Sequence, residues 1–367
     1  MYCRRCGFKV NEGATECPFC HNSLIEEEKK EQVVEQTPVY YQEEKVEEPT
    51  VEKEDVNKQE YVNINETAMT KGMRNACGYI NLKTNFLHHV LIASVGYLLM
   101  YVLFIFIGRG LLSLYQANGM NLDCAFNGSL EACPIEVQQV YMKITTIGQA
   151  GAELLVVVAV ALVFMKYLKP LFAEFKQGRT FKWFGIGFGL MYGLNLIYSI
   201  ILTVLDLNST STNQDLVNET IFANPVLGFI FVVIAAPLFE EVIFRLGIFR
   251  AFANKGKKME IAGIIITTLL FAFVHMTATI ESVFADISNP DYELLKSDLL
   301  SLPSYLIGAF CLTFAYYKSK NFLTPMLVHM AWNLMAFISI IGTAGLTESE
   351  SIFNLIPTII ETLTRLF

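Results

Sequence analysis

The stretch AAPLFEEVIFRLGIF, residues 235–249, places two adjacent carboxylates and an arginine inside an otherwise apolar run. A charged side chain at the centre of a membrane-spanning helix costs about 2.5–3.5 kcal/mol on insertion scales. The free-energy cost of inserting Glu240, Glu241 and Arg245 can be offset by the surrounding apolar side chains. That offset does not explain why the charged residues are present. Ionisable residues in such a position indicate a functional site.

The spacing of these charges predicts different roles for the two carboxylates. Glu241 and Arg245 are four residues apart with the acid first, which favours an ion pair on one helix face. Glu240 points about 100° away around the helix. We therefore expect Arg245 to neutralise Glu241 and Glu240 to face a polar cavity, with Pro237 opening the helix to water.

Two later apolar segments carry matching polar pairs. FAFVHM contains Phe271 and His275, and LVHMAWNLM contains His329 and Asn333. Each pair is spaced i,i+4 and so shares a helix face. A shared site would explain why three separate segments each carry polar groups. For any one of these residues taken alone, a hydrogen bond between helices is the structural alternative.

Two other polar residues within apolar segments, Glu153 and Asn195, have no such companions. For these two residues we favour a structural role in helix packing.

The converging set suits hydrolysis. Glu240 is a candidate general base that takes a proton from water, with His275 orienting that water. His329 and Asn333 are candidate donors to an oxyanion on a peptide carbonyl. The same groups alternatively suit a catalytic metal, because two His and a carboxylate form an open zinc site, although no His-Glu-x-x-His pattern is present.

Composition indicates a polytopic membrane protein. Of 367 residues, 53% are hydrophobic and 17% are charged, and the mean hydropathy is +0.42. The net charge of −8 comes mainly from acids in the first 66 residues, which argues against nucleic acid as a partner. The N-terminus shows no apolar signal-peptide core, so we expect it to stay in the cytosol.

The apolar segments predict an all-α bundle of seven to eight spans in residues 67–367, each crossing a hydrocarbon core about 30 Å thick. The sixth span is marginal, and residues 351–367 either form an eighth or lie in the interface. The predicted spans are 88–114, 144–168, 183–205, 226–250, 260–281, 303–318 and 322–344.

Basic residues give an independent test of this topology. Residues 115–142 and 206–225 contain no Lys or Arg, whereas the loops between them are basic. This alternation fits a multi-pass protein of the cell membrane with a cytosolic N-terminus. Cys124 and Cys133 fall in the first outside loop, where a disulfide is plausible, while Cys77 and Cys311 are expected to carry no chemistry.

The first 22 residues carry Cys3-x-x-Cys6 and Cys17-x-x-Cys20. Four thiolates at this spacing predict a small zinc ribbon, in which the metal is structural because all four positions are filled. Disulfides or free thiols are the alternatives. Residues 23–66 are acidic and poor in apolar residues, so we expect a disordered linker, and the ribbon is a candidate adaptor for a cytosolic protein partner.

The three polar motifs resemble the CPBP family of intramembrane proteases, which includes the type II CAAX prenyl endopeptidases and relatives linked to bacteriocin processing and self-immunity. The family pattern is Glu-Glu-x-x-x-Arg, Phe-x-x-x-His and His-x-x-x-Asn or Asp on successive membrane helices. All three occur here, at 240–245, 271–275 and 329–333, within a resembling region of about 180–345.

The resemblance implies an intramembrane endopeptidase with a water-filled cavity open to the cytosol and a peptide or protein substrate near that face. It implies Glu240 and His275 as the water-activating pair and His329 and Asn333 as oxyanion donors, of a glutamate or metal-dependent type. One departure is an acidic outside loop at 282–302. The alternative functions are a non-proteolytic self-immunity or scaffold protein of the same fold and, less favoured, a transporter.

Overall fold

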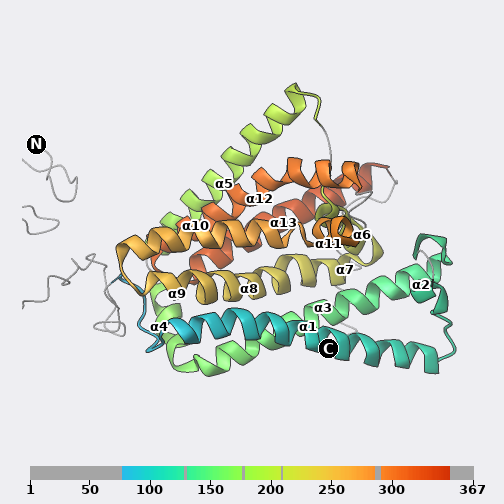
Figure 1. The fold of residues 1–367 in the computed structure, drawn as a ribbon, viewed down its shortest axis with the longest axis horizontal. Coiled ribbons are helices and arrows are strands. Elements are labelled where there is room, and N and C mark those ends of the chain that lie inside the picture. Colours follow the sequence, from blue (N-terminus) through green and yellow to red (C-terminus); the bar gives the residue numbers. More distant parts are fainter. Residues whose placement is uncertain (1–76, 128–129, 176–177, 208–209, 286–290, 348–367) are drawn as a thin grey trace, which may run out of the picture. The chain divides into compact units, whose positions relative to one another are not determined.

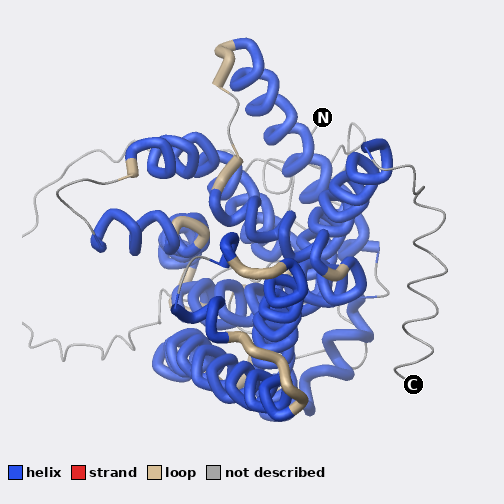
Figure 2. Tube along the Cα trace, turned by 90° about the vertical axis from the view of Figure 1, so that its right-hand side faces the viewer, coloured by secondary structure: helices blue, strands red, loops and turns tan. Residues whose placement is uncertain are grey.

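The computed structural model describes residues 77–127, 130–175, 178–207, 210–285 and 291–347, all within one compact unit. The predicted zinc ligands Cys3, Cys6, Cys17 and Cys20, the linker at 23–66 and the segment at 351–367 lie outside the described residues. The described part is built of helices without a β-sheet, as Figures 1 and 2 show. This confirms the all-α prediction for these residues.

The helices follow one another with short connections and include two π-helical segments and one 3₁₀ turn. In chain order they are α1 (Phe86–Ala117), α2 (Asp123–Asn127), the 3₁₀ turn η1 (Leu130–Ala132), α3 (Ile135–Val163), α4 (Met165–Phe175), α5 (Gly178–Val204), α6 (Thr212–Ala223), α7 (Pro225–Gly228), the π-helix η2 (Phe229–Ala235), α8 (Ala236–Glu240), the π-helix η3 (Glu241–Phe249), α9 (Arg250–Ala253), α10 (Lys257–Val274), α11 (Thr277–Ala285), α12 (Tyr292–Ser319) and α13 (Leu323–Thr347).

Six helical stretches are long and apolar enough to cross a membrane, and α10 with α11 makes a seventh if this bent pair counts as one span. The predicted span at 260–281 corresponds to this pair, and the chain bends by 63° between α10 and α11. The cause lies at His275, whose Nδ1 atom bonds the Phe271 carbonyl at 2.8 Å. The backbone N–H of His275 bonds the Phe273 carbonyl instead, and the helix ends.

The prediction of a loop at 282–302 is wrong for residues 292–302, which belong to α12. Asp291 caps the first turn of α12 by accepting a hydrogen bond from the Leu294 N–H, and residues 292–302 are helical. Pro303, the first residue of the predicted sixth span, lies inside α12. The marginal sixth span at 303–318 is therefore the C-terminal part of a 28-residue helix.

Helices meet closely around the segment that holds the two glutamates. A buried cluster that includes Phe239, Phe244 and Phe271 joins this segment to α1, α3, α10 and α12. A Cβ atom added at Gly247 would lie 2.9 Å from the Ala93 Cβ atom, so glycine permits the close approach of α1 to η3. These contacts hold the polar motifs at the centre of the bundle.

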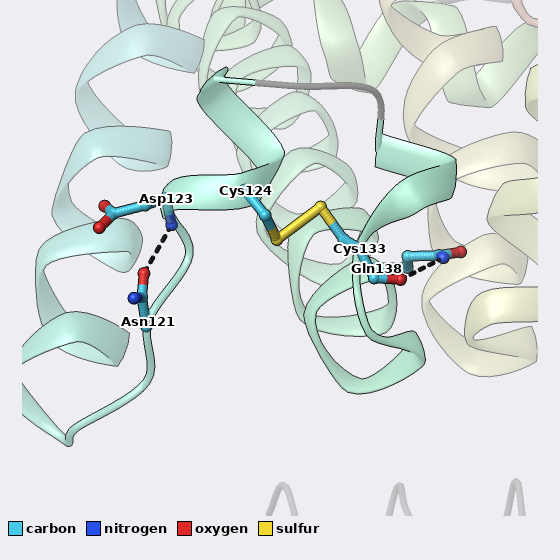
Figure 3. The surroundings of a disulfide bond; sticks show 5 residues. All are labelled: Asn121, Asp123, Cys124, Cys133 and Gln138. Carbon is cyan, nitrogen blue, oxygen red and sulfur yellow. Dashed lines mark hydrogen bonds between the residues drawn. A yellow bond between two sulfur atoms is a disulfide. The ribbon is translucent and has the colours of Figure 1, made fainter.

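The bundle has two chemically different ends, which Figure 1 shows at opposite sides of the view. The end with α4, α9 and residues 318–322 we call the basic end; the end with α2, η1 and α6 we call the disulfide end. At the latter, Cys124 and Cys133 form the predicted disulfide, and Gln138 bonds the Cys133 carbonyl, as Figure 3 shows.

Candidate active site

The Glu241–Arg245 pair lies in the protein interior. The Arg245 Nη1 atom is 2.9 Å from Glu241 Oε1, and both side chains have 0% exposure. Arg245 also donates from Nη2 to the Ala309 carbonyl at 3.2 Å, and its guanidinium lies 4.7 Å from the Phe271 ring centroid. The ion pair that the i,i+4 spacing predicts is present, and it ties η3 to α12 and α10.

His329 of α13 lies between the two carboxylates. Its Nδ1 atom is 3.0 Å from Glu241 Oε1, and its Nε2 atom is 3.7 Å from Glu240 Oε2. Because an ionised carboxylate only accepts hydrogen bonds, Nδ1 is the donor to Glu241 and Nε2 is directed to Glu240. The first and third motifs therefore meet, although they are 88 residues apart in the chain.

A cavity of about 670 Å³ brings the remaining polar groups together. Glu240, His275, His329 and Asn333 all line it, whereas Glu241 and Arg245 do not. Glu240 thus faces a cavity and Glu241 is turned into the ion pair, as the spacing predicts. The Glu240 Oε2 atom is buried and has no hydrogen-bond partner in the described part of the chain.

The His275 ring is fixed from several directions. Its Nδ1 atom donates to the Phe271 carbonyl at 2.8 Å, because a carbonyl can only accept, so the neutral ring carries its lone pair on Nε2. The Phe271 ring lies 4.7 Å away between centroids and the Tyr305 ring 4.6 Å away. Phe271 also contacts His329 and Arg245 and so links all three motifs.

Asn333 is held by a carbonyl that Pro237 leaves free. In the π-helix η2 the N–H of Ala236 bonds the Phe231 carbonyl, five residues back. The next bond of this kind would join residue 237 to Val232, but proline has no N–H. The Asn333 Nδ2 atom donates to the Val232 carbonyl at 2.8 Å instead. Its second N–H remains for another acceptor.

Several residues of the cavity were missed by the sequence prediction. Tyr305 stacks on His275 and bonds Ser211 Oγ at 2.7 Å through its hydroxyl, and both line the cavity. Asn195 accepts a hydrogen bond from Ser304 and so joins α5 to α12, which fits the expected structural role, and it also lines the cavity. Hydroxyl and amide residues in helices are too common for spacing alone to single them out.

Glu153, for which we expected a structural role, is buried on α3. Its Oε1 atom accepts from Gln149 Nε2 at 2.8 Å, and Gln149 lines the cavity. This hydrogen bond fits a role in placing the Gln149 amide on the cavity wall.

In the described ranges, no three His, Cys, Asp or Glu side chains are arranged to hold a metal ion. The convergence of Glu240, His275 and His329 on one cavity therefore does not amount to a preformed metal site in this geometry.

The sequence that forms this site matches a protein-family model. Residues 222–335 match the model described as type II CAAX prenyl endopeptidase Rce1-like. This range contains all three polar motifs, from Glu240 to Asn333.

Curated relatives extend the comparison without adding a known activity. The chain is 29% identical to UPF0177 protein YvdC of Lactococcus lactis subsp. lactis over 42% of this chain and 50% of that protein. It is 30% identical to an uncharacterised protein of Mycoplasma capricolum subsp. capricolum over 41% of this chain and 40% of that protein. The match therefore spans half or less of these two relatives.

A second Lactococcus lactis protein, UPF0177 protein YxdF, is 26% identical over 52% of this chain and 90% of its own length. No solved structure matches the chain. Residues 222–335 of the helical core are thus similar to the Rce1-like family model, and the UPF0177 relatives support the resemblance to the CPBP family.

Proposed function

We propose that the protein is an intramembrane endopeptidase that hydrolyses peptide bonds of membrane-associated peptides or proteins. One observation carries the proposal: Glu240, His275, His329 and Asn333, from three helical segments, line a single cavity. A carboxylate with one oxygen that makes no hydrogen bond in the described chain, on the same cavity as two imidazoles, suits general-base hydrolysis.

In the proposed reaction, Glu240 removes a proton from water and the resulting hydroxide attacks the peptide carbonyl carbon. His275 accepts a hydrogen bond from that water through Nε2, because its Nδ1 is occupied by the Phe271 carbonyl. The proton held by Glu240 then passes to the leaving amine.

The developing oxyanion needs hydrogen-bond donors in fixed positions. Asn333 offers its second N–H, with the first held by the Val232 carbonyl. His329 donates from Nε2 when it carries both ring protons, with Nδ1 held by Glu241. Glu241 and Arg245 orient His329 and do not themselves contact substrate in this proposal.

Structural zinc at Cys3, Cys6, Cys17 and Cys20 remains a separate proposal, as does a cytosolic partner of that ribbon. Metal content of the purified chain, compared with a Cys3→Ser/Cys6→Ser variant, tests it. One zinc per chain in the wild type and none in the variant is the expected result.

The test of the protease uses the purified full chain in lipid vesicles with a panel of quenched fluorescent peptides. We expect cleavage by the wild type, and loss of cleavage in Glu240→Gln, which keeps the side-chain volume. Glu293→Gln is the matched control, because Glu293 is an acid of α12 whose side chain is 88% exposed. Cleavage that survives a chelator supports the glutamate mechanism.

Two results would contradict the proposal. One is cleavage that persists unchanged in Glu240→Gln. The other is no cleavage of any peptide by the wild type while Glu240→Gln restores the phenotype of a deletion strain, which favours a non-proteolytic immunity or scaffold role. Loss of cleavage on chelation would keep the endopeptidase but give Glu240 and the histidines a metal-binding role.

A further inference from the structure

We propose that the cavity opens on the non-cytosolic face of the membrane, opposite to the face that the family resemblance implies. Its substrates are then exported peptides or the non-cytosolic ends of membrane-anchored proteins. The substrate class rests on the proposed function, but the direction of the opening does not.

The cavity extends from the centre of the bundle to the disulfide end. Its inner wall includes Glu240 and His329, and its outer wall includes Leu130 of η1 with Leu216 and Glu219 of α6. Leu216 is 51% exposed and Glu219 is also exposed. Figure 1 shows α6 and α2 together at this end of the bundle.

Towards the basic end the cavity is closed by packed side chains. Arg245 is fully buried against Glu241, the Ala309 carbonyl and the Phe271 ring. Val242 and Leu246 line a separate apolar cavity of about 160 Å³, on the other side of the packed Arg245 and Glu241 side chains. No described residue of α4, α9 or 318–322 lines the large cavity.

The sidedness of the two ends follows from their basic residues, which gather on the cytosolic side of membrane proteins. At the disulfide end, α2, η1 and α6 contain no Lys or Arg, and the adjoining halves of α1, α3 and α12 contain only Arg109, Lys143 and Lys296. The segments of the basic end contribute many more: Lys166, Lys169, Lys176, Arg179, Lys182, Arg250, Lys255, Lys257, Lys258, Lys318 and Lys320.

The disulfide gives an independent indication of the same orientation. Cys124 and Cys133 are bonded in the connection between α1 and α3. Structural disulfides persist on the oxidising, non-cytosolic side of a membrane and are rare in the cytosol. Leu130 lies within the loop that this bond closes, and it lines the cavity. The wall of the opening is thus itself on the oxidising side.

The chemistry of the wall indicates the kind of peptide that fits. Its polar groups are hydroxyls, amides, the imidazoles of His275 and His329, and the acids Glu219 and Glu240, and the described lining contains no Lys or Arg. Such a wall offers hydrogen bonds to an extended backbone and favours neutral or cationic side chains near the scissile bond. Anionic peptides are expected to be poor substrates.

A second cavity adjoins the first at the flank of α5. This space of about 340 Å³ between α5 and α12 is lined by Tyr198, Leu202 and Leu300, among others. Four residues line both cavities: Asn195, Ser301, Ser304 and Trp332.

Cysteine accessibility tests the opening without requiring any cleavage. Leu216→Cys marks the outer wall, Ala236→Cys marks the cavity one turn before Glu240, and Lys257→Cys marks the exposed basic end. A charged, membrane-impermeant methanethiosulfonate is added to right-side-out and to inside-out vesicles, without a reductant. The wild-type chain gives the background, which is low for Cys77 because burial raises the pKa of its thiol.

We expect Leu216→Cys and Ala236→Cys to react in right-side-out vesicles and Lys257→Cys to react only in inside-out vesicles. Ser301→Cys, also on the cavity wall, replaces Ala236→Cys if that variant does not fold. The proposal is overturned if the cavity position reacts from the same side as position 257. It is also overturned if the cavity position reacts from neither side while positions 216 and 257 react.

A second arm tests the substrate class with an impermeant cationic peptide. Cleavage is expected when the peptide is outside right-side-out vesicles and not when it is outside inside-out vesicles, and Glu240→Gln abolishes it. Cleavage only in inside-out vesicles contradicts the substrate class. If neither vesicle orientation shows cleavage while the cysteine labelling is as expected, the endopeptidase proposal is contradicted and the direction of the opening is still established.

Discussion

Two buried arginines five residues apart on one helical stretch have different surroundings. Arg250, at the basic end, has partners for all three nitrogens: Asn254 at 3.3 Å, the Tyr316 hydroxyl at 3.0 Å and the Ile80 carbonyl at 3.0 Å. Arg245, beside the cavity, has Glu241 and Ala309, and its Nε atom has no partner in the described residues.

The neighbourhoods of these arginines repeat the contrast. At the basic end, Lys320 bonds Glu260 at 2.7 Å and the Tyr79 hydroxyl at 3.1 Å. Burial lowers the pKa of Lys320, and the Glu260 carboxylate opposes that shift. At the cavity, one oxygen of Glu240 and one of Glu241 lack partners within the described chain.

Buried polar groups that are fully hydrogen-bonded stabilise a unique packing, whereas unsatisfied ones cost free energy. Incomplete satisfaction beside a cavity leaves groups free to bind water or substrate. The comparison teaches that the hydrogen-bonded groups of the basic end stabilise the fold. At the cavity, unsatisfied polar groups lower the stability but are free to take part in a reaction.

The largest expected effect is on the basic end. Lys320→Met leaves Glu260 buried without its cation, which typically costs 3–5 kcal/mol. We expect that loss in the free energy of unfolding, measured by denaturant titration in detergent, with the activity of the remaining folded molecules retained. The double variant Lys320→Met/Glu260→Met should recover most of the stability. A stable single variant with no activity would reverse the assignment of this region.

Asn333→Ala should show the opposite pattern at the cavity. Loss of one oxyanion donor lowers kcat by about 10²–10³, or about 2.7–4 kcal/mol. The variant also loses the hydrogen bond from Asn333 to the Val232 carbonyl, which contributes only about 0.5–1.5 kcal/mol, so the unfolding midpoint should change less than kcat. Asn118→Ala at the exposed end of α1 serves as the control. An unchanged kcat would remove Asn333 from the proposed mechanism.

The disulfide lies at the cavity opening and sharpens the comparison from a third position. Cys124→Ser/Cys133→Ser opens a loop with a sequence separation of 9 residues. A cross-link over so short a loop contributes about 2–3 kcal/mol in the chain-entropy model. We expect a lower thermal midpoint without reductant and a smaller effect on kcat than on KM, because Leu130 in this loop lines the cavity. An equal midpoint would show that the loop is held by its packing alone.

Pro237→Ala should have the smallest effect. The new N–H competes with Asn333 for the Val232 carbonyl, so we expect kcat to fall about tenfold, which is about 1.4 kcal/mol, while the helix gains a hydrogen bond. Kinetics and a thermal melt of the same preparation measure both. A variant that is as active as the wild type would mean that Asn333 is held without that carbonyl.

Much of the site could be predicted from spacing because i,i+4 pairs on a helix share a face. This rule gave the Glu241–Arg245 pair and separated Glu240 from it. Hydropathy located the spans, although the sixth was predicted to start at residue 303 and its helix starts at Tyr292. The convergence of the three polar motifs on one cavity was expected because each motif lies in its own apolar segment.

The remainder depended on contacts that spacing does not encode. The bend after α10 arises because the His275 side chain donates a hydrogen bond to the Phe271 carbonyl. A hydropathy profile does not contain information about such a hydrogen bond. The start of α12 was missed because residues 292–302 contain three charged side chains, which lower the hydropathy of this part of the helix. Tyr305 was missed because its position against His275 depends on how α12 packs, which one sequence does not reveal.

The central claim is best tested with two buried acids, one from each region, changed in the same way. Glu240→Gln and Glu260→Gln are each assayed for peptide cleavage per folded molecule and for the free energy of unfolding. The account predicts that Glu240→Gln loses cleavage by about 10²–10⁴-fold with its stability kept, and that Glu260→Gln loses stability with its cleavage kept. Full cleavage by Glu240→Gln, with Glu260→Gln folded and inactive, would contradict it.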